Sequence, residues 1–181
     1  MRYSKEAANS RDRDDDKKFC FCENYSKLRK LFLECGHNPQ DAVFDIDDGE
    51  VRRGQAFVLN RVLVDAACLC RPLVKIEFSS IVFFEAEDED GDEKEVEVDL
   101  LFKLERVCGH SVECVQTWRY LKEFDVEGEN VDELEVEISE PFTVTFCDTP
   151  CPGCCEYRMV VEGLDFEGEF EALRVTKPDL S

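Results

Sequence analysis

The chain has 181 residues, with 22 Lys and Arg against 43 Asp and Glu, which gives a net charge of -21. A surface with this charge repels phosphate backbones and anionic lipid headgroups, so we expect no nucleic-acid partner. No apolar run approaches the ~18–20 residues of a membrane helix, so we expect no membrane insertion. The length suits one domain that buries its own core.

The first residues differ in composition from the rest of the chain. Residues 1–18 carry mixed charge and almost no apolar side chains, which is typical of a mobile arm. We expect a flexible arm over residues 1–23 and a single domain over 24–181. The stretch 24–36 fits either a helix that ends at Gly36 or a short strand. No apolar stretch in the first 22 residues could serve as a signal peptide.

From residue 55 onward, apolar and polar residues alternate as they do in β-strands. The alternation is clearest at 95–105. In 57–70, we expect Val58 and Val62 on one face and Leu59 and Leu63 on the other. Strands are predicted at 57–70, 73–87, 95–105, 112–121, 133–138, 142–147, 156–162 and 166–175.

Turn residues punctuate this pattern. Asp90-Gly91 is typical of a hairpin turn between the second and third predicted strands. The Ser79-Ser80 pair predicts a bulge that shifts the alternation by one residue. Pro141 separates the strands at 133–138 and 142–147. About eight short strands without a long helix predict an all-β fold, an antiparallel β-sandwich or jelly roll, and exclude a parallel α/β fold.

Eleven cysteines are spread along the chain, and an odd number leaves at least one thiol outside any closed set of internal disulfides. The largest group reads Cys-Asp-Thr-Pro-Cys-Pro-Gly-Cys-Cys. Its spacing resembles iron–sulfur and thioredoxin-type motifs, but the β-pattern around it argues against both. We expect these residues to form intradomain disulfides or a metal site: Cys68, Cys70, Cys147, Cys151, Cys154 and Cys155. The alternative is a structural zinc ion held by Cys68, Cys70, Cys151 and Cys154.

Cys20 and Cys22 lie where the charged arm meets the domain, in the sequence Phe-Cys-Phe-Cys. An extended arm of this length spans about 60–70 Å, which is enough to reach a neighbouring subunit. The alternation suits a strand added to another subunit's sheet, with cysteines on one face for cross-linking. A first edge strand bonded within its own domain is the other interpretation. The candidates for intersubunit disulfides are Cys20, Cys22, Cys35, Cys108 and Cys114.

Other residues give weaker signals. The acidic segments 44–50 and 87–94 fail the EF-hand pattern and fit solvated turns. His37 and His110 each follow Cys-Gly, without an orienting partner that would indicate nucleophilic catalysis. Trp118 is expected in the core. We therefore expect a protein that is not an enzyme, with no catalytic residues and no cofactor.

The segment VDAACLCRPLVKIEFSS at 64–80, with CDTPCPGCCEYRMVV at 147–161, resembles a known family. It is similar to a cysteine-rich domain-of-unknown-function family of anaerobic spore-forming Firmicutes, over roughly residues 35–161. The family has two further segments between these two blocks, and here they would be Phe102–Cys108 and Trp118–Tyr120. The chain is more acidic than the family and lacks one cysteine after Cys147. The resemblance brings no assigned activity.

By analogy of design alone, these features resemble endospore-appendage subunits, in which jelly-roll domains stack into disulfide-linked fibres. The expectation is therefore a structural, self-assembling subunit of an extracellular or spore-surface fibre that binds copies of itself. Export without a classical signal peptide would follow from release at lysis of the mother cell. The alternative function is a small, zinc-stabilised intracellular binding module.

Overall fold

A computed structural model describes residues 33–66, 72–88, 93–127, 134–150 and 153–181. The described residues form ten strands and no helix. The bounds are β1 Ala42–Val43, β2 Ile46–Asp47, β3 Glu50–Val51, β4 Ala56–Asp65, β5 Val74–Asp88, β6 Glu93–Cys108, β7 Ser111–Glu127, β8 Leu134–Asp148, β9 Cys154–Glu167 and β10 Glu169–Leu180. Within these ranges no helix is long and apolar enough to cross a membrane.

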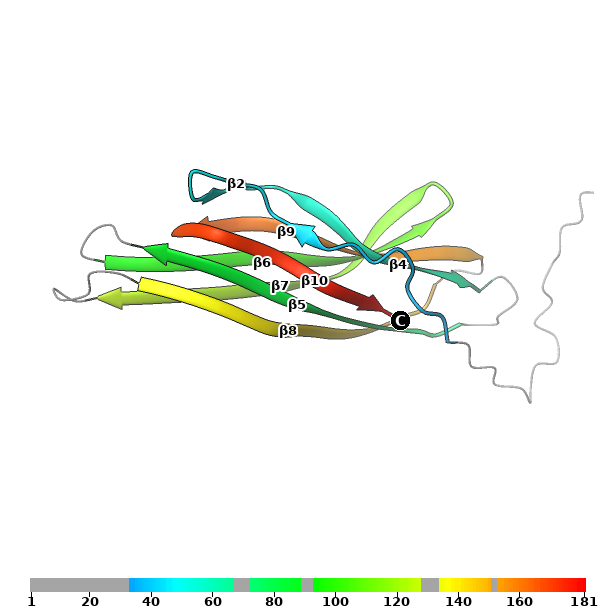
Figure 1. The fold of residues 1–181 in the computed structure, drawn as a ribbon. Helices are drawn as coiled ribbons and strands as arrows, with labels where there is room; N and C mark the ends of the chain where they lie inside the picture. Colours follow the sequence, from blue (N-terminus) through cyan, green and yellow to red (C-terminus); the bar gives the residue numbers. More distant parts are fainter. Residues whose placement is uncertain (1–32, 67–71, 89–92, 128–133, 151–152) are drawn as a thin grey trace, which may run out of the picture.

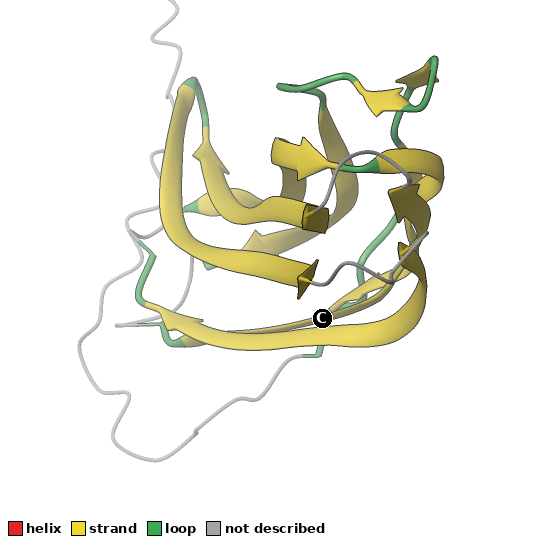
Figure 2. Ribbon diagram, turned by 90° about the vertical axis from the view of Figure 1, so that its left-hand side faces the viewer, coloured by secondary structure: helices red, strands yellow, loops and turns green. Residues whose placement is uncertain are grey.

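Eight of the strands form two antiparallel sheets that pack face to face (Figures 1 and 2). The first sheet has the order β1-β10-β5-β8, and the second has the order β4-β9-β6-β7. Except for the β6–β7 hairpin, consecutive long strands lie in opposite sheets, and this strand order is that of a jelly roll. The remaining pair, β2 and β3, forms a small ribbon whose Asp48-Gly49 turn has both residues at positive φ. The predicted all-β sandwich is confirmed, and so is the turn in the acidic segment 44–50.

The core lies between the two sheets because one face of each long strand is apolar. Val96, Val98, Leu100, Phe102 and Leu104 of β6 are all 0% exposed, as the alternation predicts. They face an apolar row on β5 that includes Phe78 and Phe84. This burial is the main favourable term in folding such a sandwich.

Several strands, such as β6, β7 and β9, are longer than expected, and two predicted breaks are absent. β8 runs through Pro141 as one strand of 15 residues. An edge strand accepts proline because alternate N–H groups point away from its single neighbour. In β5 the alternation continues through Ser79 and Ser80, and Ser80 occupies a buried position. The irregularity lies in the partner strand instead, between Thr176 and Asp179 of β10.

Two further predictions about the first long strands are wrong. The strands that flank Asp90-Gly91 do not pair, because β5 and β6 belong to different sheets, so this connection crosses the sandwich. The turn residues themselves lie outside the described residues. In β4, a bulge between Val58 and Asn60 shifts the alternation. Leu59 therefore lies in the core with Val62, whereas Leu63 is exposed.

The segment from Gly36 to Val43, called the strap here, closes one flank of the sandwich. It bridges the two sheets. Gly36 N–H donates to Leu180 O of β10 in the first sheet, and Gln40 N–H donates to Leu59 O of β4 in the second. The side chain of Asp41 accepts from the N–H of Lys177, which has a positive φ. The predicted helix or strand over 24–36 lies mostly outside the described residues, and 33–36 form neither.

Candidate functional site: a cysteine-rich end with two open strand edges

The described cysteines gather towards one end of the sandwich, which we call the cysteine end. Cys154 begins β9 opposite Asp65, the last residue of β4. Cys147 lies one residue before the end of β8, opposite Lys75 near the start of β5. The β6–β7 turn lies at the same end and is preceded by Cys108. The strand bounds thus bring together cysteines that lie far apart in the sequence.

One disulfide joins neighbouring strands of the second sheet at this end. Cys108 of β6 and Cys155 of β9 are bonded, with Cα atoms 4.5 Å apart and a sequence separation of 47. The adjacent register pair is Val107 and Glu156, so the disulfide lies directly across two antiparallel strands. Cys155 is buried, so the disulfide closes this end of the core.

This disulfide corrects the expected role of Cys108. The sequence placed it among the intersubunit candidates, but its sulfur is bonded within the chain. The sequence did not predict this pairing, because the two cysteines are 47 residues apart and only the β6–β9 register makes them neighbours. Cys155 takes part in the intradomain disulfide class expected for it.

Four described cysteines carry exposed free thiols: Cys35, Cys114, Cys147 and Cys154. Cys35 and Cys114 were expected as intersubunit candidates, whereas Cys147 and Cys154 were expected in intradomain disulfides or a metal site. In the described part of the chain, neither Cys147 nor Cys154 has a disulfide partner. The other candidates lie outside the described residues: Cys20, Cys22, Cys68, Cys70 and Cys151.

The alternative zinc site is represented by a single residue. Of Cys68, Cys70, Cys151 and Cys154, only Cys154 belongs to the described residues. Among those residues, no three His, Cys, Asp or Glu side chains are grouped so that they could hold a metal ion. The proposed tetrahedron therefore stays a prediction.

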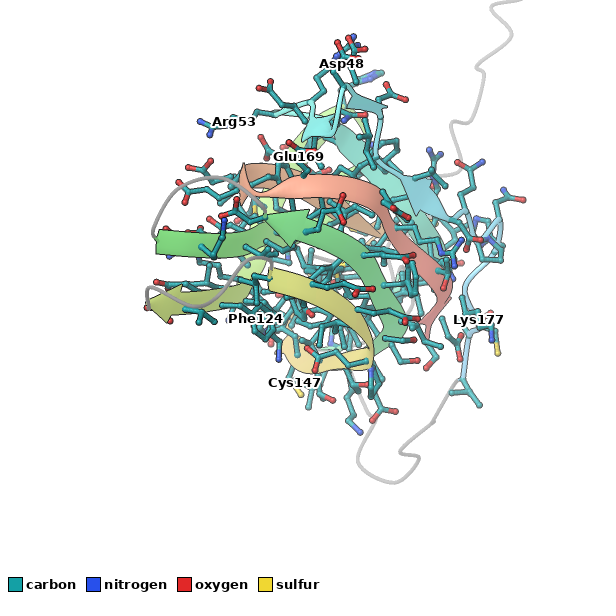
Figure 3. The ribbon with its side chains drawn as sticks, turned by 60° about the vertical axis from the view of Figure 1, so that its left-hand side comes forward. Asp48, Arg53, Phe124, Cys147, Glu169 and Lys177 are labelled. Carbon is teal, nitrogen blue, oxygen red and sulfur yellow. A yellow bond between two sulfur atoms is a disulfide. The ribbon has the colours of Figure 1, made fainter. Side chains whose placement is uncertain are left out.

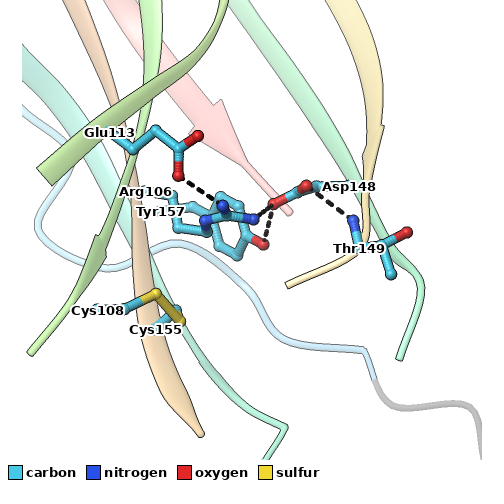
Figure 4. A network of polar contacts seen from close by, with 7 residues as sticks. All are labelled: Arg106, Cys108, Glu113, Asp148, Thr149, Cys155 and Tyr157. Atoms are coloured by element: carbon cyan, nitrogen blue, oxygen red, sulfur yellow. Dashed lines mark hydrogen bonds and ion pairs between the residues drawn. A yellow bond between two sulfur atoms is a disulfide. The ribbon is translucent and has the colours of Figure 1, made fainter. Parts of the chain in front are cut away.

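A partly buried polar network lies beside the disulfide and links the two sheets (Figure 4). The Arg106 guanidinium of β6 donates to Asp148 of β8 at 2.5 Å and to Glu113 of β7 at 2.7 Å. The Tyr157 hydroxyl of β9 donates to the same Asp148 oxygen at 2.7 Å, and the Thr149 N–H donates to the other at 2.7 Å. Three strands of the second sheet are thereby bonded to the edge strand of the first.

The surroundings of this network keep Arg106 charged and Tyr157 neutral. Burial acts to lower the pKa of Arg106, but hydrogen bonds to Glu113 and Asp148 outweigh it, so the pKa is raised. Burial raises the pKa of Tyr157, and its bond to Asp148 adds to the effect. Tyr157 thus stays protonated as a donor and Arg106 stays cationic. The network orients the cysteine end rather than providing an acid or base near neutral pH.

The flank opposite the strap carries two long strand edges. β7 and β8 are the edge strands there, and within the described residues their outer edges pair with no other strand. Their side chains contact one another across the sandwich: the Trp118 and Phe146 rings lie 6.3 Å apart, and Lys122 Nζ lies 2.8 Å from Glu140 Oε1. The side chains therefore meet, while the backbone edges stay available for another strand.

The end opposite the cysteines has an acidic outer face on the second sheet. Glu97 lies opposite Glu167 on β9 and opposite Glu123 on β7. Burial first, then the charges of Glu167 and Asp165, raise the pKa of Glu97. Like charges directly opposite one another across strands are destabilising. This acidic face therefore repels itself.

The sequence interpretation missed Arg106, Asp148, Tyr157 and Asn60. Asn60 is 2% exposed; its Nδ2 donates to Pro178 O at 3.1 Å and its Oδ1 accepts from the Arg61 N–H. A polar residue within an apolar run, such as Asn60 in FVLNRVLV, is a signal for a buried hydrogen-bonded position. The network around Arg106 has no such signal, because its members come from four strands.

A comparison with protein families matches residues 30–181 to a domain of unknown function, DUF4489. The chain belongs to the DUF4489 family. The DUF4489 match covers the strap and both sheets, and Cys20 and Cys22 precede it. The expected membership of a domain-of-unknown-function family is confirmed at this level. A comparison with curated proteins finds no relative of the chain.

Proposed function

We propose that this DUF4489 protein is a structural subunit that assembles with copies of itself into a disulfide-cross-linked fibre. The observation that carries the proposal is the open flank, where β7 and β8 present long edges that no other described strand pairs with, each with an exposed thiol near the cysteine end. Added strands bind such edges through main-chain hydrogen bonds, and thiols then make the contact covalent.

The N-terminal segment is the proposed donor. Its Phe-Cys-Phe-Cys sequence precedes the DUF4489 match, so Cys20 and Cys22 lie outside the conserved domain boundary at residue 30. The acceptors expected from sequence were Cys35, Cys108 and Cys114, and the Cys108–Cys155 disulfide removes Cys108 from that set. Assembly in this form leaves each copy with one donor arm and one acceptor edge.

The resemblance to endospore-appendage subunits supports an extracellular or spore-surface location. Synthesis in a reducing compartment followed by oxidation after release would account for many thiols together with only one described disulfide. The acidic outer face would keep assembled fibres apart, because like-charged surfaces repel. No nucleic-acid partner and no membrane insertion form part of the proposal.

Non-reducing electrophoresis of the full chain tests this function. Boiled, oxidised protein should run as a ladder of multimers that collapses to monomer on reduction, and negative-stain images should show filaments. The matched control is Cys20→Ser/Cys22→Ser, which should stay monomeric in the same gel. Oxidised wild-type protein that runs only as monomer would rule out the proposal.

Metal analysis separates this function from the zinc-stabilised module. Protein purified without reductant should contain far less than one zinc per chain. One zinc per chain, together with unreacted thiols and no multimers, would support the module instead.

A further inference from the structure

We propose that the outer edge of β8 binds the N-terminal segment of a second copy, and that Cys147 is the thiol to which Cys20 or Cys22 becomes bonded. This inference rests on the proposed function and names its acceptor. It differs from the acceptors expected from the sequence, which did not include Cys147. Figure 3 shows Cys147 on the outer side of the sandwich, at the end of β8.

Of the four free thiols in the described part of the chain, two lie on open strand edges. Cys154 belongs to β9, which has β4 on one side and β6 on the other, so no strand can be added beside it. Cys35 lies outside the sheets, next to the strap. Cys114 and Cys147 belong to β7 and β8, the two edge strands of the open flank.

The regularity of the two edges favours β8. Near Cys114, a bulge shifts the register of β7 against Leu104 and Glu105 of β6, and the Cys114 thiol is directed to Gln116 O at 3.6 Å. Bulges twist an edge away from further pairing. β8 pairs with β5 without interruption from Leu134 to Asp148, so its outer edge is regular next to Cys147.

The direction of the backbone N–H and C=O groups also favours Cys147 as the acceptor. Pro141 has no N–H, so it fits a position whose N–H would point away from β5. Odd-numbered residues of β8 share that direction, so the backbone groups of Thr143, Thr145 and Cys147 point to the open edge. The seven residues from 142 to 148 contain no proline and can accept a strand.

The two faces of β8 match the two faces of the donor sequence. Thr143, Thr145 and Cys147 are exposed, whereas Phe142, Val144 and Phe146 are half-buried and pack against the core. In the donor, phenylalanine and cysteine alternate at 19–22. A strand with Phe19 and Phe21 beside the half-buried row has Cys20 and Cys22 on the face of Cys147.

The sheets already contain a disulfide of this type. Cys108 and Cys155 are bonded directly across two antiparallel strands with a Cα–Cα distance of 4.5 Å. Because the backbone groups of Cys147 point to the open edge, a cysteine opposite it on a docked antiparallel strand forms a hydrogen-bonded pair with Cα atoms about 5.5 Å apart, which a disulfide also spans. The bond therefore needs no movement of the β8 backbone.

Length and charge fit an arm that reaches another copy. Gly36 is bonded to Leu180, whose register continues through Phe78 to Val144 of β8, so the strap and β8 lie three strand spacings, about 14–15 Å, apart. The 14 residues from Cys22 to Gly36 span up to about 46–50 Å, which reaches well past the chain's own edge. Residues 1–32 carry nine basic and six acidic residues, a net charge of +3 in a chain of net charge -21, so the arm is attracted to another copy's acidic surface.

The bond forms by two exchange steps with an oxidised low-molecular-weight disulfide. The Cys147 thiolate attacks that disulfide, forms a mixed disulfide and releases one small thiol. The Cys20 or Cys22 thiolate of the second copy then attacks the Cys147 sulfur and releases the second small thiol. Two protein thiols are oxidised, and one small disulfide is reduced to two thiols.

A donor–acceptor mixing experiment tests the assignment. The donor is Cys147→Ser, and the acceptor is an isotopically labelled Cys20→Ser/Cys22→Ser chain that retains Cys147. After oxidation with glutathione disulfide, mass spectrometry should find a peptide that links labelled Cys147 to unlabelled Cys20 or Cys22. Adding Cys114→Ser to the acceptor is the matched control and should leave the yield unchanged, whereas adding Cys147→Ser should abolish the link.

The outcomes separate the acceptor from the proposed function. Mixed dimers linked through Cys114 or another thiol would overturn the β8 assignment and leave the fibre proposal standing. In an equal mixture of labelled and unlabelled wild-type chains, links from Cys20 or Cys22 to Cys147 that never join the two labels would overturn intermolecular assembly. Phe19→Ser/Phe21→Ser in the donor should reduce the yield at least threefold, and an unchanged yield would overturn the strand docking.

Discussion

Arg106 and Asp148 join the two sheets of the sandwich through a hydrogen bond of 2.5 Å, although they lie on strands that share no backbone bond. Their side chains are 14% and 15% exposed, so the ion pair is largely removed from water. Because Tyr157 and Thr149 also donate to Asp148, its carboxylate is held on three sides.

Asp148→Asn should therefore destabilise the fold. The substitution keeps the shape but removes the charge opposite Arg106, and leaving a buried cation unpaired costs about 3–5 kcal/mol when burial is complete. With the exposure seen here we expect a loss of about 2–3 kcal/mol in the free energy of unfolding. Urea denaturation in a Cys20→Ser/Cys22→Ser background measures it. Glu113→Gln removes a carboxylate whose side chain is 61% exposed, so it should cost less than 1 kcal/mol. Equal losses for the two variants would contradict this account.

The Cys108–Cys155 disulfide should stabilise the monomer independently of assembly. A disulfide that closes a loop of this length contributes about 4 kcal/mol by chain entropy and commonly about 2–4 kcal/mol in practice. Cys108→Ala/Cys155→Ala should lower the free energy of unfolding by that amount in oxidised protein. Cys114→Ala, which removes an exposed free thiol, is the control and should change it by less than 0.5 kcal/mol. If the two variants were equally stable, the disulfide would not contribute to the fold.

Glu97→Gln should stabilise the protein at neutral pH. The pKa of Glu97 is raised by burial and by neighbouring acids, so its charged form is disfavoured in the folded state. Stability is therefore lost as pH rises from the unfolded pKa of 4.5 through the raised folded value. The variant should gain about 0.5 kcal/mol at pH 7, which is about 1–2 °C in Tm.

The same gain should disappear below pH 4.5, where the carboxyl is protonated in both folded and unfolded protein. Glu156→Gln is the matched control, because its cross-strand neighbours Leu63 and Val107 are uncharged. Thermal melts of both variants at pH 4 and pH 7 make the comparison. A gain for Glu97→Gln that persists at pH 4 would mean that charge repulsion is not its cause.

Asn60→Ala should destabilise the flank that the strap closes. The side chain bonds Pro178 O and the Arg61 N–H, and Gly36 packs so closely against it that an added Cβ would lie 2.6 Å from Asn60 Oδ1. Leaving these buried groups without a partner costs about 1–3 kcal/mol. Hydrogen exchange should show faster exchange of the Gly36 and Gln40 amides, which bond Leu180 O and Leu59 O. Unchanged protection at these amides would show that the strap does not depend on Asn60.

The sequence predicted the fold class because alternation reports directly on which face of a strand is buried. It predicted the β6 core residues correctly, where nothing interrupts the period of two. It failed at Ser80, which takes a buried position in a regular strand, and at Leu59, which a bulge turns inward. In both places tertiary packing overrides the local pattern, and polarity along the chain does not report that packing.

The site was less predictable than the fold. The alternation of Phe and Cys at 19–22 pointed to a donor strand, but the acceptor depends on which strands form edges. That order follows from the jelly-roll connections, which bring β8 to an edge and enclose β9. For the same reason Cys108 could not be assigned to Cys155 before the β6–β9 register was known.

The strap covers one flank of the sandwich, whereas no described segment covers the edges of β7 and β8 on the opposite flank. If two copies joined by pairing the same edge with itself, the contact would be used up after two chains. An arm that binds an edge elsewhere on the next copy uses different surfaces on its two sides, so every added chain renews the vacant position. A polymer built this way has two unlike tips, one with an unused arm and one with a bare β8, and the two tips should elongate at different speeds.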